Sequence, residues 1–216
     1  MSKYNIVLFD LDGTVIDSIE GILNSMNYSF RNVGIDEINK ENLLPFIGPP
    51  IVHTLQQHYG MTEEAANHTM TFYHKYYREK GWKQFSLYDG IEELIKELKR
   101  QGKKIGMATN KPKYYAEKII EYKNLHMFFD YIGGSNFEKG ITNKKLVILD
   151  CLDKMGVNDK SKVVMIGDRH YDIDGAKEAG IDAIGITYGY GDKNELTKAG
   201  AIKVLDTTKN IIEFLE

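Results

Sequence analysis

The sequence predicts an α/β fold, in which a doubly wound parallel sheet carries a helical insertion after its first strand. Two observations lead to this prediction. Short apolar runs recur along most of the chain and alternate with stretches of helical periodicity, which is the pattern of a parallel sheet covered by helices on both faces. One long stretch near the N-terminus offers helical patterns only.

Six apolar runs are the candidate strands. The first, Ile6-Val7-Leu8-Phe9, is continuous and ends at Asp10, so we expect it to be buried on both faces of the sheet. Since crossovers between parallel strands are right-handed, the succession predicts helices on both sides of one sheet. The other runs span residues 104–108, 129–133, 163–166, 183–186 and 202–205.

The stretches between these runs are predicted to be helices. Ile91, Leu94, Ile95 and Leu98 recur at helical spacing, and Gly102 follows as a stop signal. Less regular patterns of the same kind cover residues 112–122, 143–155, 171–179 and 210–215.

Residues 17–86 break the alternation and predict a separate helical domain. Pro49 and Pro50 suit the first turn of a helix, where a missing N–H costs little, and Thr62 can cap the next helix. We therefore expect a core domain of residues 1–16 and 87–216 and a helical domain of residues 17–86. Helical patterns in the insertion span residues 19–33, 49–59 and 62–80.

Composition and charge predict a folded protein that binds neither nucleic acid nor a membrane. The 216 residues are 42% hydrophobic and 27% charged, with a formal net charge of −3 and no run of five like charges, so no basic footprint for a polyanion is present. The four apolar residues before Asp10 are too few for a signal peptide or a membrane span, which predicts a cytoplasmic location. The single cysteine, Cys151, is expected to be a buried, unreactive thiol.

Polar residues gather just after three of the predicted strands. Asp10-Leu11-Asp12-Gly13-Thr14 follows the first, Thr109-Asn110-Lys111 the second, and Gly167-Asp168-Arg169-His170-Tyr171-Asp172 the fourth. Because ligands of such sheets bind outside the carboxyl ends of the strands, carboxylates from distant stretches are expected to meet at one edge. They would repel one another without a cation, and a site of a few carboxylates that also holds phosphate suits Mg²⁺.

These motifs, in this order and across the whole chain, resemble the four motifs of the haloacid dehalogenase superfamily, which has a Rossmann-like core. The helical insertion is similar to that family's cap domain of the first type. Three further matches resemble the branch of phosphoglycolate phosphatases and 5′-nucleotidase-like enzymes, namely Phe46-Ile47-Gly48-Pro49-Pro50, Gly167-Asp168-Arg169 and Tyr188-Gly189-Tyr190-Gly191.

The resemblance implies a Mg²⁺-dependent phosphatase that forms an aspartyl-phosphate with a small phosphorylated metabolite. Asp10 is the expected nucleophile, because a carboxylate needs no base to activate it at neutral pH. Asp12 is the expected general acid and base, and its backbone carbonyl is expected to help hold the metal. Asp10 and Asp168 are expected to bind Mg²⁺, and Asp172 either binds it directly or orients a water on it.

The family's third motif is a lysine, for which Lys144 and Lys145 compete; spacing to the following apolar residues favours Lys144. Thr109 and the N–H of Asn110 are expected to bind the phosphoryl oxygens. Gly13 lets the chain turn closely past the phosphate.

Two segments have open roles. Arg169 is expected to contact the substrate, whereas His170 either contacts the substrate or lies on the surface. The loop Gly48-Pro49-Pro50 either selects the substrate or simply begins a helix.

The motifs leave the substrate open between phosphoglycolate and a nucleoside monophosphate. A phosphomutase would use the same aspartyl-phosphate but return the phosphoryl group to a sugar. A non-enzymatic phosphate-sensing module also presents acids, a threonine and a lysine at strand ends, although Asp12 and the large insertion argue against it. The oligomeric state is not predicted.

Overall fold

The computed structural model describes residues 3–43, 46–47 and 51–216. The chain splits into two compact units, a core unit of Met1–Ile16 with Leu87–Glu216 and a helical unit of Asp17–Ser86. The loop Gly48-Pro49-Pro50, for which two roles were left open above, lies outside the described residues.

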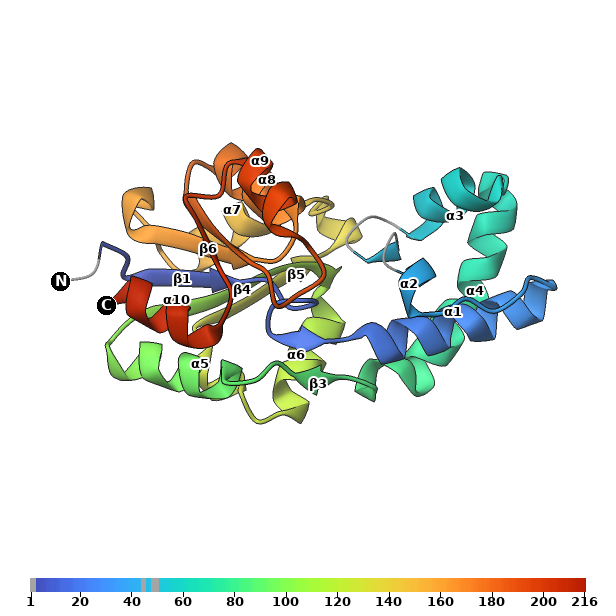
Figure 1. Cartoon of the computed structure of the whole chain (residues 1–216), viewed down its shortest axis with the longest axis horizontal. Coiled ribbons are helices and arrows are strands. Elements are labelled where there is room, and N and C mark those ends of the chain that lie inside the picture. Colours follow the sequence, from blue (N-terminus) through green and yellow to red (C-terminus); the bar gives the residue numbers. More distant parts are fainter. Residues whose placement is uncertain (1–2, 44–45, 48–50) are drawn as a thin grey trace. The chain divides into compact units, whose positions relative to one another are not determined.

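The core unit is built on a six-stranded parallel sheet (Figure 1) with the strand order β5-β4-β1-β6-β7-β8. The predicted α/β fold is confirmed. The largest departure from the predicted strands is at β4, which continues to Pro112 through a shift of register between Thr109 and Pro112. The strands are β1 (Ile6–Phe9), β4 (Lys104–Pro112), β5 (Tyr131–Ser135), β6 (Val163–Gly167), β7 (Asp182–Ile186) and β8 (Lys203–Leu205).

Helices cover both faces of this sheet, with α7, α8 and α9 on one face and α5, α6 and α10 on the other (Figure 1). Helix α9 was not predicted from the sequence. Leu196 is its one buried residue, so its sequence shows no helical periodicity of apolar residues. The helices are α5 (Ile91–Arg100), α6 (Lys113–Tyr122), α7 (Lys144–Lys154), α8 (His170–Ala179), α9 (Lys193–Ala199) and α10 (Thr208–Leu215).

The core between the sheet and α7 and α8 is apolar and contains the single cysteine. Leu8 of β1 packs there with Val147 and Ile148 of α7 and Ile173 of α8. Cys151 is fully buried, its Sγ donates to the Met107 carbonyl at 3.0 Å, and burial raises the pKa of its thiol to about 12. The thiol is therefore protonated at neutral pH.

The register of the sheet aligns the carboxyl ends of its central strands. Phe9, the last residue of β1, lies opposite Met107 of β4 and Ile166 of β6. Residues that follow β1 and β6 and those near the end of β4 therefore lie at the same edge of the sheet, which is where ligands of parallel sheets bind.

The helical unit packs α1 against α4 around an aromatic and aliphatic core that includes Met26, Phe30 and Tyr77. Thr62 caps α4 as predicted, because its Oγ1 accepts from Ala65 N at 3.2 Å. The short helix α2 was not predicted, since four residues carry no helical period. The helices are α1 (Ile19–Val33), α2 (Lys40–Leu43), α3 (Ile51–Tyr59) and α4 (Glu63–Glu79).

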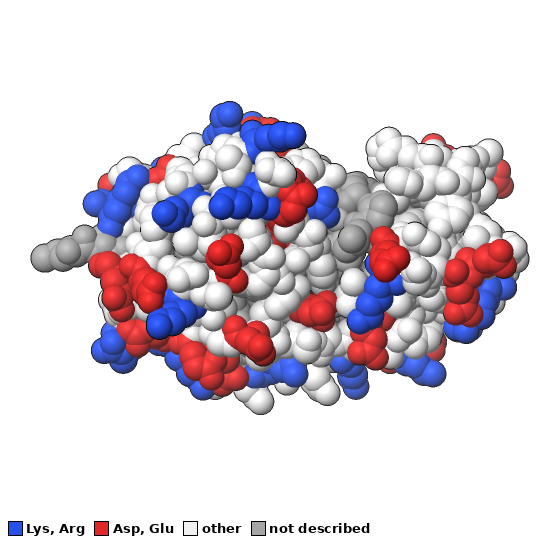
Figure 2. Space-filling model, in the orientation of Figure 1, with Lys and Arg blue, Asp and Glu red and all other residues white. Residues whose placement is uncertain are grey.

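The chain passes between the units at two short strands, β2 (Ile16–Asp17) and β3 (Ser86–Leu87), which pair in a two-stranded sheet. Three-residue 3₁₀ turns complete the structure at Gly81–Lys83, His126–Phe128, Phe137–Lys139 and Lys160–Lys162. Among the described residues no helix has both the length and the apolar character to cross a membrane. On the face shown in Figure 2, acidic and basic side chains lie interspersed.

The buried sheet predicts a clear contrast between two isoleucines of the core unit. Ile184 in β7 is fully buried, whereas Ile202 is 46% exposed. We expect Ile184→Ala to lower the free energy of unfolding by about 2–5 kcal/mol, because it removes packed methyl groups and leaves a cavity. Ile202→Ala is the control and should cost less than about 0.5 kcal/mol. Urea unfolding measures both, and equal losses would contradict the assigned core.

Candidate active site

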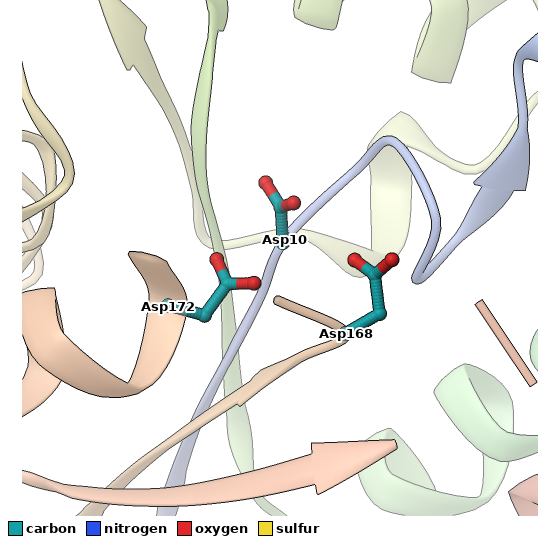
Figure 3. A group of neighbouring side chains, drawn as sticks. All are labelled: Asp10, Asp168 and Asp172. Atoms are coloured by element: carbon teal, nitrogen blue, oxygen red, sulfur yellow. The ribbon is translucent and has the colours of Figure 1, made fainter. Parts of the chain in front are cut away.

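Three buried carboxylates meet at the carboxyl edge of the sheet (Figure 3). Asp10 follows β1, Asp168 follows β6, and Asp172 lies in the first turn of α8. Their residues are 9%, 0% and 1% exposed, and one carboxylate oxygen from each lies within 4.8 Å of the others. The structure thus brings together three acids that are up to 162 residues apart in the sequence.

One lysine lies among these carboxylates. The Nζ of Lys144, at the start of α7, donates to Asp10 Oδ1 at 2.8 Å and to the Ala108 carbonyl at 2.9 Å, and it lies 2.7 Å from Asp172 Oδ1. Lys145 lies elsewhere, with its Nζ 3.9 Å from Glu178 Oε2 and its side chain 43% exposed. Of the two competing lysines, Lys144 is therefore the one in contact with Asp10.

The electrostatics of this cluster follow from its burial. Burial raises the pKa of Asp10 to about 6; Lys144 opposes this rise, whereas Asp172 and Asp12 add to it by repulsion. Burial and the neighbouring Asp172 and Asp10 also raise the pKa of Asp168 well above its usual range. Burial alone would lower the pKa of Lys144, but Asp10 and Asp172 raise it above its ordinary value. Lys144 is therefore charged, and burial and mutual repulsion both oppose ionisation of the carboxylates around it.

This cluster fits a hard divalent cation. Its donors are all carboxylate oxygens, which are the ligands that Mg²⁺ and Ca²⁺ prefer. When ionised, the three carboxylates exceed the one ammonium by two negative charges, which a single dication balances.

Asp172 has a second contact that fixes its direction. Its Oδ2 accepts from the backbone N–H of Arg169 at 3.1 Å, at the N-terminus of α8. A carboxylate in the first turn of a helix is favoured by the unpaired N–H groups there. The start of α8 therefore orients the same side chain that contacts Lys144.

Two separate loops orient Asp168. Thr14 Oγ1 donates to its Oδ1 at 3.3 Å, and the backbone N–H of Tyr190 donates to its Oδ2 at 2.8 Å. The Thr14 hydroxyl therefore connects the loop after β1 to the residue that follows β6. Tyr190 lies in the loop after β7, where sequence reasoning noted the motif but assigned it no role at the site.

Two glycines allow these loops to approach Asp168. Gly13 has a φ of +85°, and a Cβ there would overlap the Asp168 carboxylate. A Cβ at Gly191 would overlap the backbone carbonyl of Asp168. Glycine is therefore required at both positions by the closeness of the chain to Asp168, while the predicted approach of Gly13 to a phosphate stays a prediction.

Asp12 pairs with Lys111, which the sequence placed at this edge of the sheet without assigning it a role. The Nζ of Lys111 lies 2.8 Å from Asp12 Oδ1 and 2.7 Å from Oδ2, and the two side chains are 7% and 18% exposed. The position of Lys111 directly after Thr109 and Asn110, near the end of a central strand, is the sequence feature that could have indicated a role at the site.

The two residues expected to bind phosphoryl oxygens lie on β4, next to β1. Thr109 is 2% exposed, and its Oγ1 accepts from the backbone N–H of Lys111 at 3.2 Å. The Oδ1 of Asn110 is buried without a hydrogen-bond partner among the described residues. Since buried polar atoms are normally paired, this atom has an unused acceptor at the edge where ligands bind.

Arg169 and His170 contact acidic side chains of α9 and α8. Arg169 Nε and the backbone N–H of His170 both donate to Glu195 Oε1, each at 2.8 Å. His170 Nδ1 lies 3.0 Å from Asp174 Oδ2 on the surface of α8. The substrate contact expected of Arg169 stays a prediction, and the role of His170 stays open.

Comparisons with known proteins identify the family of this chain. Residues 7–186 match the family described as haloacid dehalogenase-like hydrolase. A 5′-nucleotidase of Pseudomonas aeruginosa is 36% identical over 194 residues, which are 90% of this chain and 87% of that protein. The solved structure of a candidate phosphatase from Clostridium difficile has 40% identity and a TM-score of 0.91, and all of both chains is covered.

A third protein is similar over its whole length. The structure of a candidate phosphoglycolate phosphatase from Lactobacillus delbrueckii subsp. bulgaricus has 25% identity and a TM-score of 0.89, and the match covers 100% of this chain and 99% of that one. The chain therefore belongs to the haloacid dehalogenase-like hydrolase family and is an enzyme of its phosphatase branch.

Proposed function

We propose that the chain is a Mg²⁺-dependent phosphomonoester hydrolase that forms an aspartyl-phosphate on Asp10 and acts on a small phosphorylated metabolite. One observation carries the proposal: Asp10 is a buried carboxylate that contacts Lys144 and shares its site with two further carboxylates. This arrangement supplies a nucleophile, a fixed cation beside it and ligands for a metal.

The Asp10 carboxylate is the proposed nucleophile. One of its oxygens forms a bond to the phosphorus, and the bond from phosphorus to the leaving-group oxygen breaks. Lys144 favours the charged form of Asp10, against the rise in its pKa that burial causes. Thr109 and the N–H of Asn110 are proposed to bind the oxygens of the phosphoryl group during transfer.

Asp12 is the proposed general acid and base. It gives a proton to the leaving-group oxygen and then takes one from the water that hydrolyses the aspartyl-phosphate. Its position two residues after Asp10 supports this role, because both side chains come from the same loop at the carboxyl end of β1.

Asp10, Asp168 and Asp172, with the backbone carbonyl of Asp12, are the proposed ligands of Mg²⁺. Once bound, the ion neutralises charge on the carboxylates and on the phosphoryl oxygens. Thr14 and the N–H of Tyr190 keep Asp168 oriented toward the cluster, and the N-terminus of α8 does the same for Asp172.

We also propose a substrate class and a cellular location for this enzyme. The named activities of the relatives, a 5′-nucleotidase and a candidate phosphoglycolate phosphatase, support a small phosphorylated substrate. The helical unit of Asp17–Ser86 is proposed to act as a cap that selects it. We also propose a cytoplasmic location and no nucleic-acid partner, on the sequence alone.

Replacement of the nucleophile is the first test. We expect Asp10→Asn to lower kcat/KM for p-nitrophenyl phosphate by at least about 10³-fold, since the uncatalysed reaction is extremely slow and an amide does not attack phosphorus. Asp153→Asn, which changes an acid whose side chain is 74% exposed on α7, should leave turnover unchanged. Wild-type turnover by Asp10→Asn would rule out the covalent mechanism. Formation of an isomerised sugar phosphate, in place of free phosphate, would indicate a phosphomutase.

The metal site has a test that does not depend on turnover. We expect Asp168→Asn to weaken Mg²⁺ binding by at least about tenfold in calorimetric titration, because the amide has no charge to offer the cation. Asp174→Asn, on the surface of α8, is the matched control and should bind Mg²⁺ normally. EDTA should abolish phosphate release by the wild type, and added Mg²⁺ should restore it. Unaltered affinity in Asp168→Asn would remove this residue from the ligand set.

The two neighbouring lysines give a matched pair of variants. Lys144→Met removes the cation beside Asp10 and is expected to lower kcat by about 10²–10³-fold, the range seen when one electrostatic contact to the transition state is lost. Lys145→Met should retain kcat within about twofold, since surface changes are mostly neutral. Circular dichroism checks that Lys144→Met is folded. A larger loss in Lys145→Met than in Lys144→Met would show that the lysines are wrongly assigned.

A further inference from the structure

The ion pair between Lys111 and Asp12 occupies the carboxylate that is proposed to act as the general acid and base. Nζ of Lys111 lies 2.8 Å and 2.7 Å from the two carboxylate oxygens of Asp12, so one ammonium binds both of them. A general acid and base must place one oxygen within hydrogen-bond distance of the leaving-group oxygen. The Lys111 ammonium and the leaving-group oxygen therefore compete for the same carboxylate when substrate binds.

Opening the pair changes the surroundings of a buried cation. The Lys111 side chain is 7% exposed, so its contact with Asp12 is largely shielded from bulk water. A buried ammonium that moves away from a carboxylate loses the attraction of a full opposite charge. A ligand that brings an anionic group to Lys111 restores this attraction and frees Asp12 in the same step.

The position of Lys111 indicates which part of the ligand carries this anionic group. The phosphoryl group that is transferred lies at Asp10, where Lys144 is the cation in contact. Lys111 contacts Asp12 instead, the residue that acts on the leaving-group oxygen. The anion that meets Lys111 is therefore on the leaving-group side of the phosphorus.

We propose that Lys111 recognises a second anionic group, a carboxylate or a phosphate, on the leaving group of the phosphomonoester. This inference rests on the proposed phosphatase function and narrows its substrate class. Substrates with an anionic leaving group, such as 2-phosphoglycolate, open the ion pair and release Asp12. Substrates with a neutral leaving group, such as a nucleoside monophosphate, leave Asp12 held by Lys111.

A pair of substrates that differ in one group tests the proposal. 2-Phosphoglycolate and 2-hydroxyethyl phosphate share a two-carbon skeleton, but only the first has a carboxylate. We expect kcat/KM of the wild type to be at least about tenfold higher for 2-phosphoglycolate, a ratio within the usual range for one charged contact. Pyrophosphate, assayed in parallel, shows whether a phosphate serves in place of the carboxylate, and adenosine monophosphate represents the nucleosides.

Variants of the lysine connect this preference to Lys111. Lys111→Met should bring the ratio of the two kcat/KM values close to one, chiefly by raising KM for 2-phosphoglycolate. Lys111→Arg keeps the charge and should retain a preference for the carboxylate. Lys113→Met is the control, because this nearby lysine contacts Tyr131 and Glu117 on the side of α6, and it should keep the wild-type ratio.

The outcomes separate the inference from the function on which it rests. Equal kcat/KM of the wild type for both substrates would overturn the role of Lys111 while leaving the phosphatase in place, and this result needs no variant to fold. An equal loss on both substrates in Lys111→Met would also overturn it, because Lys111 would then act on Asp12 or the transferred phosphoryl group alone. No release of phosphate from any substrate would instead overturn the proposed function.

Discussion

The interaction on which the site depends is the contact of one buried ammonium with two buried carboxylates. The Nζ of Lys144 lies 2.8 Å from Asp10 Oδ1 and 2.7 Å from Asp172 Oδ1. A carboxylate oxygen of Asp168 lies within 4.8 Å of oxygens of these two acids. Carboxylates this close to one another repel strongly when they are ionised and water is excluded, so the surrounding chain must hold each of them in place. The sheet register, the start of α8 and two glycine-containing loops supply that constraint.

Three of the charged groups at this edge are also held by backbone atoms. Asp172 accepts from an N–H at the start of α8, Asp168 from an N–H of the loop after β7, and Lys144 donates to a carbonyl of β4. Backbone donors and acceptors do not rotate as side chains do, so the geometry is set before any ligand binds. Preorganisation of this kind is what electrostatic catalysis requires.

Much of the fold could be predicted because buried parallel strands are continuous apolar runs, as in Ile6–Phe9 and Val163–Gly167. The acids at their ends could be predicted for the same reason, since a strand end fixes where the next residue lies. Contacts made by side chains across loops could not. Nothing in the local pattern shows that Thr14 bonds to Asp168, that Tyr190 does so through its backbone, or that Lys111 binds Asp12. Short helices such as α9 also carry too few apolar residues to show a period.

The pairing of β2 with β3 bears on how the sequence of this chain can change in evolution. The chain leaves the core unit at Ile16 and re-enters it at Leu87, and these two points belong to adjacent strands of one small ladder. The insertion between them interrupts no strand pair of the six-stranded sheet and removes none of the acids at its edge. Residues 17–86 thus begin and end at adjacent strands, so this segment can lengthen, shorten or be exchanged while the six-stranded sheet and the acids at its edge are inherited unchanged.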